Sequence, residues 1–321
     1  MLPFHPNGML FEGLKGDEVV DSWTIYSVGG GALANEASRL ETPRSIYPLS
    51  TISEIKEWCY HEGKTFWEYV SDCEGPEIWD YLDTVWETMC ATIQRGLNND
   101  GVLPGGLKVA RKASTYWVKS KSYTDSLSSR AKIYAYALAT SEENASGGTV
   151  VTAPTCGSSG VMPAVLYHLS TSRNFLRIRI LRALATAGLF GNVAKTNSSI
   201  SGAEVGCQGE VGVACAMAAA AACQLFGGTP SQIEYAAEMG LEHHLGLTCD
   251  PVCGLVQVPC IERNAIAAAR AFDANAYATL SDGSHMVSFD KVVEVMNETG
   301  HALPSLYRET SEGGLAKRFK R

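Results

Sequence analysis

Residues 195–210 carry more reactive side chains than a structural helix or loop usually does. The segment combines the Lys195 amine, the Cys207 thiol, two carboxylates, two amides and several hydroxyls among three glycines. Glycine lets backbone N–H groups approach a ligand closely, and a cysteine among glycines is open to metal ligation or thiol chemistry. A glycine-rich helix entry around a buried, inert thiol is the structural alternative. The combination predicts a binding or catalytic site.

A second segment, residues 151–163, is also rich in glycine and hydroxyl groups. If a helix begins near Ser158, its free N–H groups and the positive end of its dipole lie at Thr155 and Gly157, which suits a carboxylate or a phosphate. Ordinary helix capping would explain the same residue types.

Three cysteines, Cys207, Cys249 and Cys260, fall in polar segments of the chain. Their spacing does not match the close pairs of a zinc ribbon. Three dispersed thiolates can instead hold an iron–sulfur cluster by three corners and leave one iron open as a Lewis acid. Buried structural thiols remain an alternative, and His243 and His244 near Cys249 keep a zinc site open.

The composition indicates a globular protein that binds neither nucleic acid nor membranes. The 321 residues are 45% hydrophobic and 19% charged, and the net charge of −8 disfavours binding to a phosphate backbone. The N-terminus has neither a basic start nor an apolar run, and the longest apolar stretch, residues 211–226, is short for a bilayer. Ten cysteines without a secretion signal are expected to be reduced. We therefore expect a cytoplasmic protein.

The hydrophobic periodicity predicts a mostly α protein preceded by a short β-hairpin. Residues 8–30 alternate and turn like a hairpin, and residues 32–50 are typical of a linker. Helical periodicity begins at Thr51, with Ser53 as the expected first cap. The expected helices cover residues 53–61, 77–95, 126–140, 158–169, 175–193, 206–226, 231–245, 259–279 and 288–299.

Three motifs in the same order resemble the iron–sulfur L-serine dehydratases. They lie at residues 153–160, 199–215 and 249–260, and residues 307–316 add a further match. The resemblance covers nearly the whole chain. It implies a deaminating dehydration of L-serine to pyruvate and ammonia on an oxygen-sensitive [4Fe–4S] cluster, without pyridoxal phosphate.

The same resemblance implies a set of ligands and a domain organisation. Cys207, Cys249 and Cys260 resemble the three cluster ligands of the family, and Cys253 is the intervening cysteine that does not bind. Residues 51–321 resemble the helical catalytic domain, and residues 1–31 resemble the last strands of an α+β domain. A homodimer is expected.

Three features depart from the family pattern. The family normally carries a preceding β domain, in the same chain or as a partner subunit, whose Ser- and His-containing motif lies near the catalytic site. This sequence starts almost directly on the hairpin, so we expect activity to need that domain as a separate partner. Some members reach the cluster with a C-terminal cysteine, whereas residues 317–321 here are mostly basic, and Cys156 stands where many members have Asn.

The expected mechanism needs groups that bind serine and move a proton. The open iron would bind the serine carboxylate and hydroxyl, and a base would remove the Cα proton. Lys195 or His285 could act as that base, with ion-paired and surface roles as their alternatives. The other catalytic candidates are Ser201, Glu204 and Gln208, and the candidates for substrate binding are Thr155, Gly157, Ser158 and Asn197.

Two other classes of protein remain open at this point. One is a non-catalytic paralogue or subunit that is stabilised by a metal or a cluster. The other is a pyridoxal-phosphate lyase, for which residues 156–160 could form the phosphate cup. That enzyme also needs a lysine for the aldimine, and no short Ser-x-Lys segment lies near the motifs.

Overall fold

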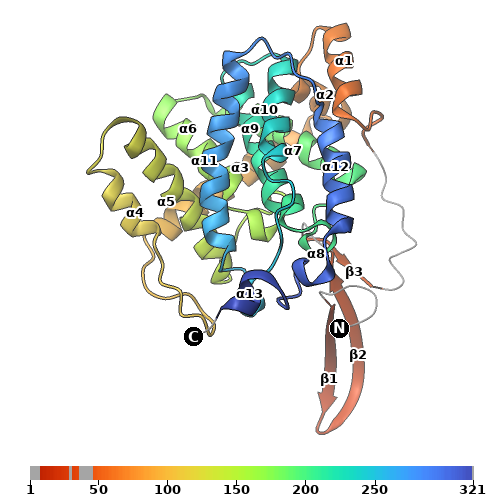
Figure 1. Cartoon of the computed structure of the whole chain (residues 1–321), viewed down its shortest axis with the longest axis vertical. Helices are drawn as coiled ribbons and strands as arrows, with labels where there is room; N and C mark the ends of the chain where they lie inside the picture. Colours follow the sequence, from red (N-terminus) through yellow and green to blue (C-terminus); the bar gives the residue numbers. More distant parts are fainter. Residues whose placement is uncertain (1–7, 29–30, 36–45, 320–321) are drawn as a thin grey trace.

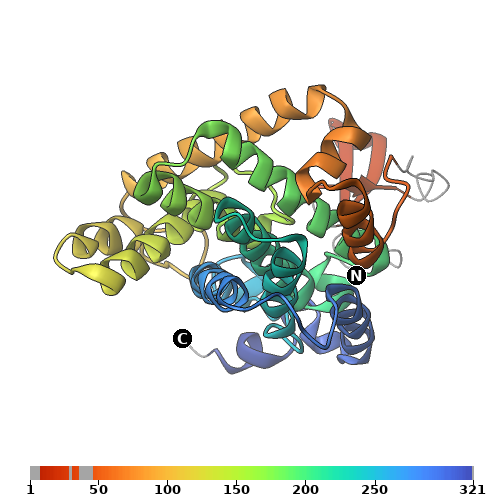
Figure 2. The same cartoon turned by 90° about the horizontal axis from the view of Figure 1, so that it is seen from above.

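The computed structural model describes residues 8–28, 31–35 and 46–319, and the expectations for residues 1–7 and for most of the linker lie outside them. A helical body follows a small sheet that projects from one end of it (Figure 1). The prediction of a mostly α protein is confirmed. Seen from above, the helices lie around a few central ones (Figure 2).

The sheet consists of β1 (Gly8–Lys15), β2 (Glu18–Ser27) and β3 (Leu33–Ala34) in the order β1-β2-β3, with both pairs antiparallel. The predicted hairpin is therefore confirmed. Tyr26 near the end of β2 is buried, whereas most of the hairpin is exposed.

Thirteen α-helices make up the body in the described part of the chain. They are α1 (Ile52–Glu62), α2 (Phe66–Glu74), α3 (Glu77–Leu97), α4 (Ala113–Ser120), α5 (Asp125–Ala145), α6 (Val161–Arg173), α7 (Arg177–Asn197), α8 (Gly202–Val205), α9 (Val213–Leu225), α10 (Pro230–Glu242), α11 (Cys260–Leu280), α12 (Phe289–Ala302) and α13 (Gly314–Arg318).

Helix α9 is the centre of the body. It packs against α6, α7, α10 and α11, and all its residues except Gln224 are buried. Small alanine side chains let the neighbouring helices approach closely: a Cβ on Gly240 of α10 would lie 2.9 Å from the Ala216 Cα. The Ala-rich run is therefore a buried core helix, as predicted. No helix in the described residues is long and apolar enough to cross a bilayer.

Two helix starts differ from the expectation. Thr51, rather than Ser53, caps α1 through a capping box with Glu54, because the Ser53 hydroxyl instead donates to Asp290 on α12 at 2.6 Å. The helix expected at Ser158 begins at Val161, after a 3-10 turn at Cys156–Ser158.

The helix expected over residues 206–226 is in two parts, and a separate short helix precedes them. Helix α8 ends at Val205, a π-helical turn covers Gln208–Gly212, and α9 follows. Gly206 separates the first two with a φ of +75°, in the left-handed region where glycine carries no steric penalty. Such π-turns occur often at functional sites.

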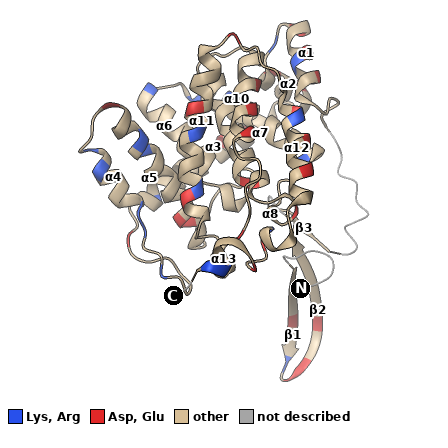
Figure 3. Cartoon of the chain, in the orientation of Figure 1, with Lys and Arg blue, Asp and Glu red and all other residues tan. Residues whose placement is uncertain are grey.

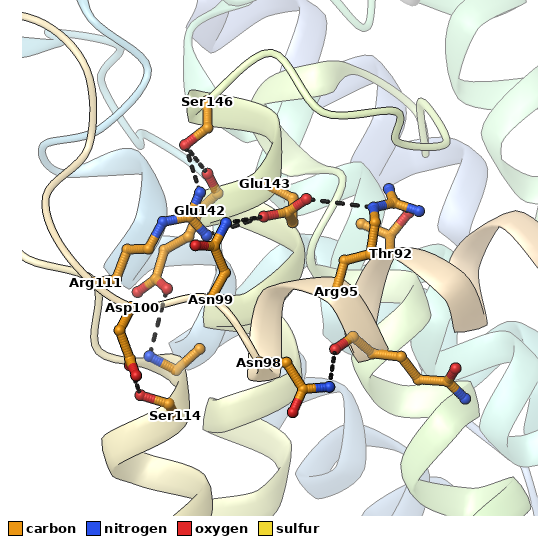
Figure 4. A network of polar contacts seen from close by, with 12 residues as sticks. Thr92, Arg95, Asn98, Asn99, Asp100, Arg111, Ser114, Glu142, Glu143 and Ser146 are labelled. Atoms are coloured by element: carbon orange, nitrogen blue, oxygen red, sulfur yellow. Dashed lines mark hydrogen bonds and ion pairs between the residues drawn. The ribbon is translucent and has the colours of Figure 1, made fainter.

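A polar network holds the loop between α3 and α4 (Figure 4). Arg111 pairs with Glu143 on α5 at 2.9 Å, and both side chains are almost fully buried. The neighbouring Glu142 accepts the Lys112 backbone N–H at the start of α4 at 2.7 Å. The loop in turn presents its Pro104 carbonyl to the Gln257 amide at 2.7 Å. The network therefore supports the segment that precedes Cys260.

Acidic and basic residues are interspersed along the helices in the view of Figure 3. Arg177 on α7, for example, forms ion pairs with Asp83 and Glu87 on α3. Those pairs neutralise a basic side chain with neighbouring carboxylates, in a chain whose net charge is −8.

Candidate metal centre

Two of the three predicted cysteine ligands meet at one point, together with a carboxylate. The sulfur atoms of Cys207 and Cys249 and a carboxylate oxygen of Glu210 all lie within 4.8 Å of one another. Cys207 comes directly before the π-turn, Glu210 lies inside it, and Cys249 follows α10. Folding therefore brings residues from two distant segments into one potential ligand set.

The two thiols and a guanidinium form an electrostatic unit. A hydrogen bond from Cys249 lowers the pKa of the Cys207 thiol against the effect of burial, and the Arg263 charge lowers it further. The same hydrogen bond and burial raise the pKa of Cys249. Arg263 also donates to the Thr248 carbonyl at 2.6 Å, which fixes its position beside Cys207.

Glu210 is held from two other segments. Its carboxylate accepts hydrogen bonds from the Thr155 side chain and from the Gly202 backbone N–H. Burial raises the pKa of the Glu210 carboxyl well above its usual range, and the charges of Cys207 and Glu309 raise it further. The structure therefore places one carboxylate of segment 195–210 directly beside the thiols.

Cys260 lies at the start of α11 next to this group, although it is not among the three that meet within 4.8 Å. Burial raises the pKa of the Cys260 thiol, and the charges of Cys207 and Glu210 raise it further. Asn264, one turn later, donates to the carbonyls of Cys260 at 2.9 Å and Gly157 at 2.7 Å. Asn264 thus ties α11 to the 3-10 turn.

The C-terminal part of the described chain clamps the Cys249 backbone. The Cys249 N–H donates to the Tyr307 carbonyl at 2.8 Å, and the Glu309 N–H donates to the Cys249 carbonyl at 2.6 Å. The neighbouring Asp250 carboxylate accepts the Leu315 N–H at 2.5 Å. The matched motif at residues 307–316 is therefore part of the support for this cysteine.

The predicted carboxylate-binding turn lies against the same site. The hydroxyls of Thr155 and Ser158 are 3.1 Å apart, and both residues are buried. A Cβ on Gly157 would approach the Glu210 carboxylate to 2.7 Å. Ser201, also buried, directly precedes α8 and Gly202. Of these four predicted residues, Thr155 and Gly157 lie against Glu210, whereas Ser158 and Ser201 adjoin residues that do.

Gln208 and Glu204 have other surroundings. The buried Gln208 amide donates to the carbonyls of Val205 and Met296 and accepts from the Gly246 N–H and the Thr299 hydroxyl. Its amide thereby joins α8 and α12 to the turn that follows α10. Glu204 is exposed, and its backbone carbonyl accepts from Arg308 at 3.1 Å.

Lys195 and Asn197 lie on the last turn of α7, which extends beyond the predicted end at Val193. Lys195 is exposed and lines a cavity of about 290 Å³ whose other lining residues include Pro154 and Ile200. Asn197 donates to the Ser50 carbonyl at 2.8 Å. Both residues are therefore near the site in sequence, but neither belongs to the ligand set.

His285 is remote from the cysteines. It lies beyond the far end of α11, which has 21 residues and begins at Cys260, so the helix alone separates them by about 30 Å. Its ring stacks on Tyr235 at 4.4 Å, and its Nδ1 donates to the Gly283 carbonyl at 2.9 Å. The structure does not bring His285 to the predicted site.

The zinc alternative receives no histidine from the described residues. His244 donates its Nδ1 hydrogen to the Gly240 carbonyl at 2.7 Å, and burial lowers its pKa to about 4. His243 similarly bonds the Met239 carbonyl at 2.9 Å. Among the described residues, the group of potential ligand atoms that all lie within 4.8 Å of one another comes from Cys207, Glu210 and Cys249, and it contains no histidine.

The residues fit a metal group in two respects. Two thiols and a carboxylate are a donor set that soft and borderline metals accept. Gly202 borders this set, and a Cβ there would lie 3.0 Å from the Cys249 sulfur and 3.3 Å from the Glu210 carboxyl carbon. The lack of a side chain at Gly202 therefore lets the backbone lie close to the Cys249 sulfur and the Glu210 carboxylate.

Comparison with known proteins identifies the family. Residues 30–316 match the family model described as serine dehydratase alpha chain. The chain belongs to this family. It is 47% identical to L-serine dehydratase 1 of Escherichia coli K12, with 98% of this chain and 72% of that protein covered. L-serine dehydratase 2 of the same organism is 45% identical over 99% of this chain and 73% of its own length. The L-serine dehydratase of Streptomyces coelicolor is 46% identical over 98% of this chain and 72% of its own length.

Within this serine dehydratase alpha chain, the sequence had not singled out Glu210, Arg263 or Asn264. The spacing could have indicated Glu210, because a residue three positions after Cys207 returns to the same side of a helical turn. No local signal identifies Arg263 or Asn264, since both act through contacts with distant segments. Cys156, the departure from the family pattern, is an exposed residue of the 3-10 turn. Partial desolvation of its thiol, and then the charge of Glu210, raise the pKa of Cys156.

Proposed function

We propose that this protein is an L-serine ammonia-lyase that converts L-serine to pyruvate and ammonia. The observation that carries the proposal is the meeting of Cys207, Cys249 and Glu210 in a chain of the serine dehydratase alpha chain family. Relatives that are 45–47% identical over nearly the whole chain are named L-serine dehydratases. We therefore carry their named substrate over to this protein.

We further propose a [4Fe–4S] cluster as the cofactor, held by Cys207, Cys249 and Cys260. The closeness of the first two sulfurs and the electrostatic coupling of all three thiols support this ligand set. Such a cluster, when bound by three thiolates, supplies an iron with an open position that acts as a Lewis acid on an oxygen ligand. Cys253 is exposed and is not included in the ligand set.

The residues around Glu210 would bind serine and move its proton. The turn at Gly157 and Ser158 would donate hydrogen bonds to the substrate carboxylate, and Thr155, whose hydroxyl donates to Glu210, would orient the Glu210 carboxylate beside the substrate. Glu210 is the carboxylate nearest the thiols, so we assign it, rather than the exposed Lys195 or Glu204, to take the proton from Cα. Loss of that proton and of the β-hydroxide leaves aminoacrylate, which tautomerises to the imine and is hydrolysed to pyruvate and ammonia.

Analysis of iron and sulfide in protein purified without oxygen tests this proposal. We expect both elements and brown visible absorbance in the wild type, and serine-dependent release of pyruvate. Cys207→Ala should lose the iron and the activity, whereas the matched variant Cys253→Ala should keep both. Bound zinc, or the absorbance of a lysine aldimine, would contradict the cluster; iron and sulfide without pyruvate release would indicate a non-catalytic paralogue.

We propose that the hairpin docks a separate β domain or subunit. The apolar side chains of Phe11 and Trp23 are 48% and 62% exposed, and a sheet this small is marginally stable in water on its own. Adding in trans the part of Escherichia coli L-serine dehydratase 1 that this chain does not cover should raise the activity. Full activity of the isolated chain, unchanged by this addition, would refute the shared site.

We also propose a cytoplasmic location and a homodimer. All ten cysteines lie within the described residues and are free, which suits a reducing compartment. Light scattering after gel filtration measures the oligomeric state directly.

A further inference from the structure

A second cavity lies where α5, α6 and α11 meet, away from the thiols. These three helices pack against one another, and the cavity between them has a volume of about 620 Å³. That volume is within the usual range for small-molecule sites. Asp273 of α11 lines it, thirteen residues after Cys260, so the cavity lies about 20 Å along the helix from the start of α11.

Most of the polar residues that line this cavity lie on α5 and α6. Ser128, Ser129 and Lys132 on α5 follow the spacing of one helix face. On α6, His168 and Arg173 border the same space. Leu169, Phe226 and Phe272 supply an apolar lining.

His168 is a buried polar residue of the cavity. Its side chain is held with Nε2 2.8 Å from the Ser129 hydroxyl, and its ring meets Phe272 edge to face at 5.5 Å. The Nδ1 atom is buried and has no hydrogen-bond partner among the described residues. Because an unpaired buried polar atom is costly, it points to an additional partner that binds here.

Two cations border the same space. Burial, followed by the charges of Lys132 and Arg173, lowers the pKa of His168 to about 4, so both cations act on the imidazole. Neither cation forms an ion pair with a residue in the described ranges. Of the two carboxylates in the lining, Asp273 pairs with Arg130 at 3.2 Å, which leaves only Asp125 to offset the two cations.

We propose that this cavity binds a small organic anion, with its anionic group between Lys132 and Arg173 and its apolar body against Phe226 and Phe272. The anionic group can be a phosphate or a carboxylate, since both accept hydrogen bonds from ammonium, guanidinium and hydroxyl donors. The inference does not rest on the proposed serine chemistry, because none of the lining residues belongs to the thiol site.

Calorimetric titration of the purified, iron-containing protein with phenyl phosphate tests the site. We expect one saturable site per chain, weaker binding of inorganic phosphate, and no binding of benzyl alcohol, which has the ring without the charge. Benzoate in place of phenyl phosphate distinguishes a carboxylate from a phosphate preference. Absence of saturable binding by both anions would overturn the proposal.

Charge variants locate the binding. Lys132→Met should weaken phenyl phosphate binding by at least about tenfold, because a charge-assisted contact is lost. Lys119→Met removes an exposed lysine on α4 and should change the affinity by less than about twofold. Equal affinity of the wild type and Lys132→Met would place the ligand elsewhere and overturn the proposal.

A nuclear magnetic resonance titration gives an independent readout. Phenyl phosphate should shift the ring protons of His168, assigned by their absence in His168→Gln. Shifts confined to other histidines would contradict the site. Retention of binding in Cys207→Ala would confirm that the cavity is independent of the metal centre, whereas its loss there would contradict that independence.

Discussion

The Cys249 thiol donates a hydrogen bond to the Cys207 sulfur across two distant segments of the chain. The bond lowers the pKa of Cys207 and raises that of Cys249, and Arg263 adds to the stabilisation of the Cys207 thiolate. One thiolate is therefore favoured in advance, and the second thiol lies close enough to ligate the same group. The predictions below test the residues that hold this pair.

Glu210 and Glu204 allow a matched test of the proton acceptor. Glu210→Gln should lower serine turnover by about 10²-fold or more while iron content stays normal, because an amide cannot take the Cα proton. Glu204→Gln, an identical change on an exposed side chain six residues earlier, should stay within about twofold. Anaerobic pyruvate formation measures both. Normal turnover in Glu210→Gln, or a large loss in Glu204→Gln, would reverse the assignment.

Gly202 should not tolerate a side chain. A Cβ at this position would lie 3.0 Å from the Cys249 sulfur, so Gly202→Ala should displace the ligand and reduce the iron content per chain. Gly188→Ala on α7 is the control, because a Cβ there meets nothing within 4 Å and alanine favours a helix by about 0.5–1 kcal/mol. Iron analysis and circular dichroism separate ligand loss from unfolding. Wild-type iron in Gly202→Ala would show that the site accommodates the methyl group.

Asn264 should be a main determinant of stability near the site. Asn264→Ala leaves the carbonyls of Gly157 and Cys260 and the N–H of Gly160 without this partner, and it should lower the free energy of unfolding by about 2–4 kcal/mol. Asn98→Ala removes one exposed hydrogen bond at the end of α3 and should cost less than about 1 kcal/mol. Urea denaturation compares the two. Equal losses would mean that water replaces the Asn264 contacts.

His168 should make stability fall in acid. Its pKa is about 4 in the folded protein and about 6.5 when unfolded, so the unfolded chain binds more protons between these values. The free energy of unfolding should therefore decrease as the pH is lowered, by roughly 2 kcal/mol between about pH 7 and about pH 5 from this residue. His244, whose pKa is also lowered to about 4, adds a similar term.

The variant His168→Gln removes one of these two titrating groups. The difference in unfolding free energy between about pH 7 and about pH 5 should shrink by roughly 2 kcal/mol, whatever the variant does to stability at neutral pH. His61→Gln, on the exposed face of α1, is the control and should leave the difference unchanged. An unchanged pH dependence in His168→Gln would mean that the pKa of this imidazole is the same in the folded and unfolded states.

The sequence by itself determined the long helices, the hairpin and the motif cysteines, but it did not predict the short helices α2, α4, α8 and α13. Periodicity predicts an element whenever its apolar face is continuous, as in α3 and α11, and the helix expected from Ser288 begins with that residue as the cap of α12. The family motifs identified Cys207 and Cys249, and the structure brings these two together. These features are local, or are repeated in relatives, and therefore can be read along the chain.

Only the tertiary structure decided which side chains of segment 195–210 belong to the site. Glu204 and Glu210 are the same residue type in one short segment. The break at Gly206 and the π-turn leave Glu204 exposed to solvent and place Glu210 beside the thiols. The Gln208 amide is engaged by α12 and by the turn after α10, and the length of α11 keeps His285 away from Cys260. Each outcome depends on packing between residues far apart in sequence, and the pattern of a single segment contains no record of its distant neighbours.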